Sequence, residues 1–395
     1  MRYFLLLCFL IPFVASAQAV VSGRLVDEQQ QPVPYASVAL ADGRAGTASN
    51  EVGEFSLKVP VLPQQLTVLS IGYERATIQV TQAGPLAAPV VLHASAVALP
   101  EVTVRANGEA EELVRRCYAK LLRHEHDVQY GRAFYRQKTQ ENGRYREFFD
   151  AFYEVKLTPR NMPSWVLGEA RYALTKGGMN FSNFSALTRS LPVFTTAHDA
   201  SHKTTLPLGP DGLAQFTFML RKTLREQGHE LAVIDFVPRV AGLSAPQGSL
   251  YIDTQTAALF RIDQELPAEQ MFNMPTSANV QRERATAHLV SDFVAYQDTL
   301  TRLASTRATA TINLLVRGFS DETKVSSYFF FYEYGPARPG ASYPDTDRYA
   351  VDLDGIRRRR YNPPFWLESG VIKASPLEEG IIQDFEGQKV FGNLK

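Results

Sequence analysis

The sequence has 395 residues, of which 45% are hydrophobic and 21% are charged, and its formal net charge is zero. This length indicates more than one domain, and the apolar content is sufficient for substantial cores. The balanced charge argues against a dedicated nucleic-acid-binding protein, because such proteins usually carry a basic excess.

The N-terminus has the pattern of a secretory signal peptide. Arg2 precedes an apolar run over residues 3–14, and small residues follow at 15–17. We predict cleavage before Gln18, with residues 1–17 as the signal peptide. Neither this run nor any later segment approaches the ~20 apolar residues of a transmembrane helix. We therefore expect an exported protein that is soluble or peripherally attached.

The segment from residue 20 to residue 92 is predicted to form a small all-β module. In residues 54–59, Phe55, Leu57 and Val59 alternate with polar residues, as in a strand with one buried face. Further short strands are separated by turns rich in Gly, Pro and Asp. Five or more such strands indicate a β-sandwich.

Five residues of this module have predicted structural roles. Asn50 can bond its own backbone and close a turn, and Gly53 permits the turn that lets Phe55 point inward. Gly72, followed by Tyr73, allows two strands to meet at a bend. None of these roles involves catalysis.

These residues carry a resemblance to the carboxypeptidase regulatory-like domain, a transthyretin-like β-sandwich. The positions that match the family pattern are Gly23, Val26, Asp27, Val33, Ala36, Val38, Gly46, Thr47, Asn50, Gly53, Phe55, Ile71, Gly72 and Tyr73. The resemblance implies a non-catalytic module, which the family fuses to exported peptidases or places at the front of outer-membrane receptors. It therefore also implies an exported protein of the periplasm or cell envelope, associated with the outer membrane or secreted. We expect residues 18–93 to form this module and to act in docking.

Residues 94–108 are predicted to be a linker. Within it, "LPEVTVRA" at 99–106 resembles the segment that follows this module in TonB-dependent receptors, where it can contact the energising protein. A plain extended linker is the favoured alternative. The remaining chain lacks the long series of amphipathic strands that a membrane receptor needs.

A helix is predicted over residues 109–127, because acidic residues occupy its first turn and basic residues its end. Leu113, Cys117 and Leu121 follow at four-residue spacing, which indicates a buried stripe. Cys117 is the single cysteine left after removal of the signal peptide, so it has no disulfide partner. Burial makes a thiol inert, and we predict a packing role for it.

The rest of the second domain, 109–395, is predicted to be rich in strands. Asn142-Gly143 marks a hairpin, and residues 253–256 mark another. Residues 158–210 are expected to be irregular and 214–228 to form a helix. The later segments indicate a large antiparallel sheet followed by a loop-rich tail.

The second domain resembles the half-barrels of outer-membrane lipoprotein-sorting and sigma-factor-regulator proteins. The residues that carry this resemblance are Ile234, Asp235, Phe236, Pro238, Gly248, Tyr251, Ile252, Asp253, Thr256 and Arg261. In lipoprotein carriers a curved sheet covered by helices forms an apolar pocket for acyl chains. A lipid or lipoprotein carrier is therefore one alternative function.

No catalytic, cofactor or metal site is predicted. His124 and His126 lie at a helix end, where alternate residues point apart, and His198 and His202 lack the glutamate of a zinc protease. Ser244 lacks the Gly-x-Ser-x-Gly spacing of a nucleophile elbow. An accessory or degenerate peptidase remains an alternative only because of the name of the sandwich family.

A run of four arginines is the most unusual polar segment, and it consists of Arg357, Arg358, Arg359 and Arg360. Such a patch can grip an anionic partner such as lipid headgroups through guanidinium forks. The favoured alternative is pairing with the aspartates at 345, 347, 352 and 354, which could otherwise bind calcium. Phe365 and Trp366 are expected to fold back onto the domain.

Together these patterns predict a mainly β fold, with an N-terminal transthyretin-like β-sandwich and a larger antiparallel β-sheet, in half-barrel form, with one or two helices. The favoured function is a non-enzymatic envelope protein, in which a docking module is fused to a binding or scaffold domain. Its expected partner is an envelope protein or a lipid, with neither nucleic acid nor a cofactor.

Overall fold

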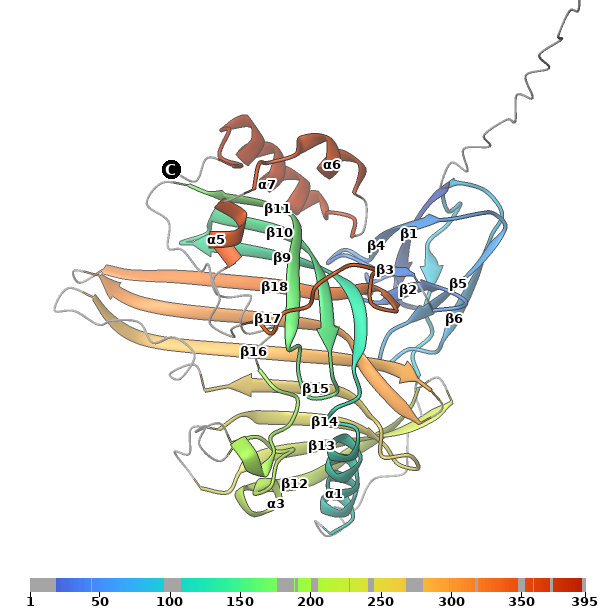
Figure 1. Cartoon of the computed structure of the whole chain (residues 1–395), viewed down its shortest axis with the longest axis vertical. Helices are drawn as coiled ribbons and strands as arrows, with labels where there is room; N and C mark the ends of the chain where they lie inside the picture. The colour runs from blue at the N-terminus through green and yellow to red at the C-terminus, as the bar shows by residue number, and fades with distance from the viewer. Residues whose placement is uncertain are drawn as a thin grey trace, which may run out of the picture.

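The computed structural model describes a defined part of the chain. The described residues are 19–43, 45–95, 108–175, 188, 191–199, 205–226, 228–240, 245–267, 280–297, 299–316, 319–346, 352–357, 359–369 and 372–392. The predicted signal peptide and most of the predicted linker lie outside them. The fold is mainly β, as predicted, with the sandwich beside a much larger sheet (Figure 1).

The N-terminal module consists of two small sheets packed face to face. Its strands are β1 (Ala19–Val26), β2 (Ser37–Leu40), β3 (Gly46–Ala48), β4 (Glu54–Val59), β5 (Gln64–Leu69), β6 (Ala76–Val80), β7 (Gly84–Pro85) and β8 (Val90–Val91). One sheet has the order β4-β1-β7, with β8 also paired to β1, and the other β3-β2-β5-β6. Phe55, Leu25 and Leu66 are fully buried between them.

The turn before β4 shows why its residue types are needed. The Asn50 side-chain oxygen Oδ1 accepts hydrogen bonds from the backbone N–H groups of Val52 and Glu54, at 3.1 and 2.9 Å. Gly53 has φ +78°, and a Cβ there would lie 2.3 Å from the Leu25 carbonyl oxygen. Only glycine fits this position, and the turn sends the side chain of Phe55 into the core.

The second domain is built on one antiparallel sheet of ten strands, in the order β11-β10-β9-β18-β17-β16-β15-β14-β13-β12. The strands are β9 (Gln129–Glu141), β10 (Arg144–Leu157), β11 (Ser164–Leu174), β12 (Phe216–Glu226), β13 (His229–Pro238), β14 (Gln247–Asp253), β15 (Leu259–Leu266), β16 (Val280–Tyr296), β17 (Leu300–Val316) and β18 (Phe319–Gly335). The sheet is open, with β11 and β12 at its edges, and it twists strongly from one edge to the other (Figure 1).

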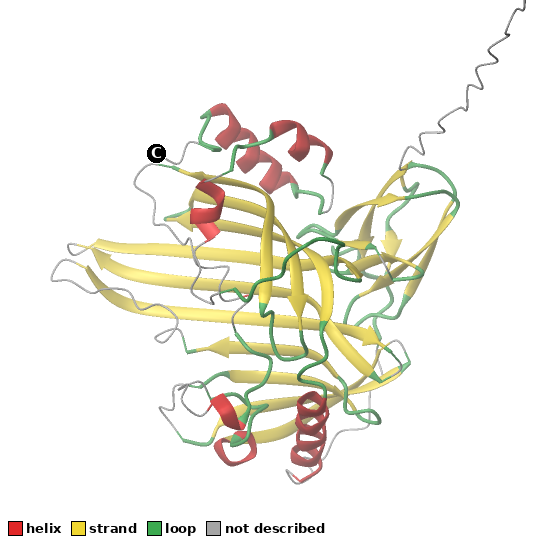
Figure 2. Ribbon diagram, in the orientation of Figure 1, coloured by secondary structure: helices red, strands yellow, loops and turns green. Residues whose placement is uncertain are grey.

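Short helices lie around the sheet, as Figure 2 shows in red. They are α1 (Gly108–Arg123), the 3₁₀ turn η1 (Ala197–Asp199), α3 (Gly212–Gln215), α5 (Asp352–Arg357), α6 (Pro363–Glu368) and α7 (Pro376–Gly387). Helix α1 contacts β12 and β14, whereas α5 contacts β11 and α7 contacts β10. The helix predicted over 109–127 is confirmed, although it ends at Arg123.

Three sequence predictions about local structure were wrong. The segment 214–228, predicted as a helix, is mostly strand β12, because the buried Phe216 and Phe218 alternate with partly or fully exposed residues and the backbone pairs with β13. The segment 158–210, expected to be irregular, contains strand β11. The tail, expected to be loops, contains α5, α6 and α7.

Both predicted hairpins are confirmed. Asn142 and Gly143 have φ +46° and +80° between β9 and β10, as a two-residue turn of this type requires. Between β14 and β15, the Asp253 carboxylate accepts hydrogen bonds from the backbone N–H groups of Gln255 and Thr256, at 3.0 and 2.6 Å. Asx turns of this kind are encoded locally, so the sequence predicts them well.

The two faces of the large sheet differ in what covers them. Tyr328 and Phe329 are neighbours on β18 and therefore point to opposite faces. Phe329 faces a core that includes residues of α5, whereas Tyr328 faces Tyr35 of the sandwich, with ring centroids 5.0 Å apart. We call the side of the sheet that Phe329 faces the α1 face, because α1 also lies there. We call the side that Tyr328 faces the sandwich face.

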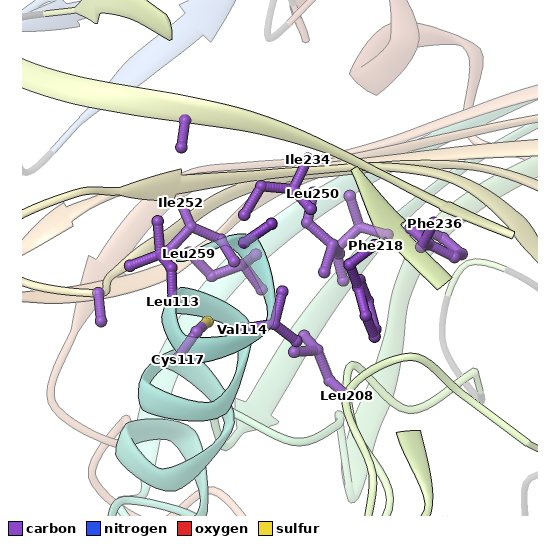
Figure 3. Close-up of a cluster of buried hydrophobic side chains, with 14 of the residues drawn as sticks. Leu113, Val114, Cys117, Leu208, Phe218, Ile234, Phe236, Leu250, Ile252 and Leu259 are labelled. Carbon is purple, nitrogen blue, oxygen red and sulfur yellow. The ribbon is translucent and has the colours of Figure 1, made fainter. Parts of the chain in front are cut away.

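The α1 face is filled by apolar side chains. Leu113, Val114 and Cys117 of α1 insert among residues of β12 to β15, and Figure 3 shows Ile234, Ile252 and their neighbours around them. The cavities lined on this side by residues such as Leu121 and Leu157 have volumes of only about 30 Å³ each. The described part of the α1 face is thus a packed core.

Candidate functional site

The sandwich face carries a row of charged residues across β9, β10 and β11, at one end of the sheet. Arg136 on β9 lies opposite Asp150 on β10, which lies opposite Arg171 on β11. Residues paired in this way share a face. Asp150 is fully buried, and its carboxylate oxygens accept hydrogen bonds from Arg136 Nε at 2.8 Å and from Arg171 Nη2 at 2.7 Å. Two guanidinium groups therefore hold one buried carboxylate.

This row is connected to the C-terminal helix and to the sandwich. Glu378 of α7 accepts from Arg136 Nη1 at 2.9 Å and from Lys138 Nζ at 3.0 Å. Lys138 Nζ also lies 2.6 Å from Glu51 Oε1 in the sandwich. We call these six side chains, including Asp150 and Arg171, the ion cluster. It joins three parts of the chain that are far apart in sequence.

The electrostatics of the ion cluster keep Glu378 ionised. Burial would by itself raise the pKa of this carboxyl, but the nearby Arg136 and Lys138 outweigh burial and lower its pKa to about 2. The same carboxylate accepts from the Ser375 backbone N–H at 2.9 Å and so completes a capping box at the start of α7. Glu378 was not among the residues predicted from the sequence, although Ser-x-x-Glu at 375–378 is a readable signal for a helix start.

Aromatic side chains of α6 cover part of the ion cluster. The Arg171 guanidinium lies over the Trp366 ring, 4.6 Å from its centroid. Phe152 of β10 packs against Phe365 and Trp366, with centroid distances of 5.4 and 5.6 Å. The prediction that Phe365 and Trp366 fold back onto the domain is therefore confirmed.

A large groove opens beside these residues, between β1 and β4 of the sandwich and helices α6 and α7. Its volume is about 1030 Å³, and Arg136 and Arg171 lie among the residues that line it. Trp366 and Ile382 supply apolar wall, whereas Lys373, Glu379 and Glu386 supply charges of both signs. Leu367 lines the groove with 87% of its surface exposed. A groove of this size suits a ligand or partner segment.

A smaller cavity of about 210 Å³ lies on the same face, between the sandwich and β9, β16, β17 and β18. It shares Arg136 and Ile372 with the groove. The lipid pocket implied by the half-barrel resemblance would instead lie under α1, where the described residues leave little space. Phe149 lies on that side, but Phe148 and Phe152 lie on the sandwich face.

The four-arginine run is only partly described. Arg357 ends α5, Arg358 lies outside the described residues, and the side chains of Arg359 and Arg360 are exposed. Arg359 donates to the Leu167 carbonyl oxygen. None of the described arginines of this run lines the groove or the smaller cavity. Of its proposed aspartate partners, Asp347 lies outside the described residues.

The histidine pairs that were considered as metal ligands do not converge where they are described. His124 Nδ1 lies 2.7 Å from Asp127, and the His126 side chain is 91% exposed. His198 lies in η1, while His202 and Ser244 fall outside the described residues. Across the described ranges, no group of three His, Cys, Asp or Glu residues is placed to hold a metal.

Cys117 is fully buried against the sheet, as its spacing predicted. Burial raises the pKa of its thiol to about 12, so the group stays protonated at neutral pH. The thiol therefore fills space in the core and is not available as a nucleophile.

The remaining motif residues of the sandwich lie where it meets the second domain or its own last segment. The Gly72 N–H donates to Glu226 Oε2 at the end of β12, at 3.0 Å. Tyr73 forms a bridge with Ala94. The bend at Gly72 thus contacts the far edge of the large sheet, away from the ion cluster.

Comparison with known proteins identifies the N-terminal module. The family model of the CarboxypepD_reg-like domain matches residues 21–104. This match confirms the resemblance that the motifs of the module carry. No curated protein has significant sequence similarity to the chain. Among the described residues, no helix is long and apolar enough to cross a membrane.

Several solved structures share some of the fold. A DUF1329 family protein from Desulfovibrio piger has 10% identity, with 60% of this chain and 95% of that chain covered and a TM-score of 0.21. A putative outer membrane lipoprotein-sorting protein domain from Vibrio parahaemolyticus has the same identity and coverage, with a TM-score of 0.22. A LolA superfamily protein from Nitrosomonas europaea has 6% identity, 61% and 99% coverage, and a TM-score of 0.17. Scores this low carry no inference of function for this chain.

Proposed function

We propose that this protein is a non-enzymatic binding protein of the cell envelope, and that it binds a segment of another envelope protein in the groove on the sandwich face. The observation that carries the proposal is the groove of about 1030 Å³, because the sandwich, the large sheet and α6–α7 all contribute to its walls. The docking module and the second domain thus share one binding surface.

The chemistry of the walls favours a polypeptide over an acyl chain. An acyl chain needs a continuous apolar wall, whereas here apolar side chains alternate with charges of both signs. A polypeptide can place an apolar anchor against Trp366 and Leu367 and pair its own charges with Lys373 and Glu379. The packed α1 face supports the same choice, because a lipid carrier would need its space to be open.

Export is part of this proposal. It is supported by the N-terminal sequence pattern and by the match to the CarboxypepD_reg-like domain. The proposal involves no catalysis. Arg136 and Arg171 of the ion cluster line the groove, and the described residues that line it include neither a histidine nor a cysteine.

The test compares two exposed leucines, one inside the groove and one outside it. Leu367 lies in the groove and Leu377 lies outside it on α7, with 87% and 50% of their surfaces exposed. We expect Leu367→Glu to abolish recovery of the partner that co-purifies with the full chain from envelope fractions. Leu377→Glu should retain it, because it places the same charge on a neighbouring helix.

Circular dichroism and thermal melting of both variants serve as the folding control. The proposal is contradicted if the two variants recover the same partners at the same level. It is also contradicted if mass spectrometry finds stoichiometric lipid, and no protein, bound to the wild-type chain.

A further inference from the structure

The cavity of about 210 Å³ between the sandwich and the sheet has a regular floor. Two rows of directly opposite side chains form it, on the sandwich face of β9, β16, β17 and β18. One row is His288, Thr309, Ser326 and Lys138, and the other is Val290, Arg307, Tyr328 and Arg136. Neighbouring strands lie about 4.8 Å apart, so the side chains of each row recur at that spacing.

The sandwich forms the opposite wall of this cavity, with Tyr35, Asn50 and Glu51. Tyr35 is partly exposed, whereas Tyr328 is buried, and their ring centroids lie 5.0 Å apart. The two rings are in contact, so a flat aromatic ligand does not fit between them. Thr309 is exposed, so the cavity is open on that side. The cavity volume equals that of about seven water molecules, which suits a ligand with a single ring.

The charged side chains that line the cavity are paired with opposite charges. The pairs are Glu51–Lys138, Glu378–Arg136, Asp292–Arg307 and Asp263–His288, at 2.6, 2.9, 3.2 and 2.7 Å. The walls therefore carry no excess of either sign. A ligand that brings its own charge gains no unmatched partner here and loses its hydration, so the cavity favours an uncharged ligand.

Four side chains that line the cavity and are at least partly exposed keep hydrogen-bonding capacity for a ligand. His288 is paired through Nε2, which leaves Nδ1, and its side chain is 45% exposed. Glu51 accepts hydrogen bonds through Oε1, which leaves Oε2, and its side chain is 36% exposed. The hydroxyl groups of Thr309 and Ser326 make no hydrogen bond to the described residues. The cavity thus offers both donors and acceptors.

We propose that this cavity binds a neutral monosaccharide. A sugar carries several hydroxyl groups on one rigid ring, and each hydroxyl group both donates and accepts, which matches the mixture of groups at His288, Thr309, Ser326 and Glu51. The C–H groups of the ring lie against Tyr35 and the aliphatic side chains of the cavity. This site does not depend on the groove or on the identity of its partner.

The test is isothermal titration calorimetry of the mature full chain with D-glucose, D-galactose and D-mannose. Cyclohexanol, a six-membered ring with one hydroxyl group, is the control for ring shape, and the uronate of each hexose is the control for charge. We expect saturable binding of at least one hexose. Cyclohexanol should bind about tenfold more weakly or worse, because it lacks most of the hydrogen bonds. The uronate should bind more weakly than its hexose, because the cavity has no unmatched cation.

A matched pair of variants then places the sugar on the floor of the cavity. Thr309 and Thr311 lie two residues apart on the same face of β17, and of the two only Thr309 lines the cavity. Thr309→Val should weaken binding by about fivefold, as loss of one hydrogen bond implies, and Thr311→Val should change it by less than about twofold.

The proposal is overturned if no hexose binds at millimolar concentration, if cyclohexanol binds as tightly as the hexose, or if the uronate binds more tightly. It is also overturned if the two variants weaken binding equally. The first three results come from the wild-type chain, so misfolding of a variant leaves the test intact.

Discussion

The two faces of the ten-stranded sheet bury different kinds of side chain. The α1 face buries Phe218, Ile234 and similar residues against one helix, and its described cavities are about 30 Å³ each. The sandwich face buries Arg136, Asp150 and Arg171 in an ion cluster, and it retains a groove and a cavity.

This difference separates stability from binding. Apolar packing stabilises a fold directly, whereas buried ion pairs offset a desolvation cost and contribute little net stability. The apolar packing of the α1 face therefore stabilises the sheet directly. The sandwich face fixes how the sandwich and α7 are placed, because its ion pairs connect specific residues of each part.

The largest expected effect comes from breaking the ion cluster. Asp150→Asn removes the carboxylate of the buried Arg171 and leaves Arg136 with Glu378 alone, so the free energy of unfolding should fall by about 3–5 kcal/mol. Urea unfolding followed by circular dichroism measures this change. Glu112→Gln, on the exposed surface of α1, is the control and should change stability by less than about 1 kcal/mol. Similar small losses in both variants would contradict the account.

The second-largest effect is expected at low pH, which should weaken the attachment of α7 to the large sheet. The pKa of Glu378 is lowered from 4.5 to about 2 in the folded protein, so the stability that it contributes is present above pH 4.5 and is lost as the pH falls toward 2. The loss should be on the order of 3 kcal/mol. Glu378→Gln should remove this part of the pH dependence, when unfolding is compared at pH 5 and pH 2. Parallel curves for wild type and variant would exclude this role.

The core on the α1 face should tolerate replacement of one buried apolar side chain by another of similar volume and different shape. Leu250 is fully buried in the apolar core under α1. Leu250→Met conserves volume and should lower the free energy of unfolding by less than about 1.5 kcal/mol. A loss as large as that of Asp150→Asn, measured in the same urea experiment, would show that the two faces do not differ in the way described.

The smallest effect is expected at the rim of the groove. Lys373 Nζ lies 2.8 Å from Glu54 Oε2, and both side chains are partly exposed. Lys373→Ala should lower stability by at most about 1 kcal/mol, and less at high salt. Thermal melts at two salt concentrations measure this change. A loss of several kcal/mol would show that the Lys373–Glu54 pair contributes as much to stability as the pairs of the ion cluster.

Local signals predicted much of the fold. The turn at Asn50 and Gly53, the hairpin at Asn142-Gly143 and the stripe around Cys117 each depend on a few adjacent residues. Strand β12 was mistaken for a helix because its assignment depends on pairing with β13, which short-range periodicity does not reveal.

The candidate site was harder to predict for the same reason. Arg136 and Glu378 lie 242 positions apart in sequence, and their contact depends on how the complete sheet and tail fold. The four-arginine run is conspicuous in sequence, but its described members do not line the groove. The capping signal at 375–378 was a local clue to Glu378, and the aromatic pair at 365–366 was a local clue to Trp366.

The most direct test of the central claim is site-specific photo-crosslinking in the cells that produce the protein. A photoreactive residue replaces Leu367 in the groove or, in a matched variant, Leu122 on α1, which is also exposed. We expect a specific crosslinked partner from position 367 and none from position 122. A partner captured from position 122 alone would contradict the assignment of binding to the sandwich face.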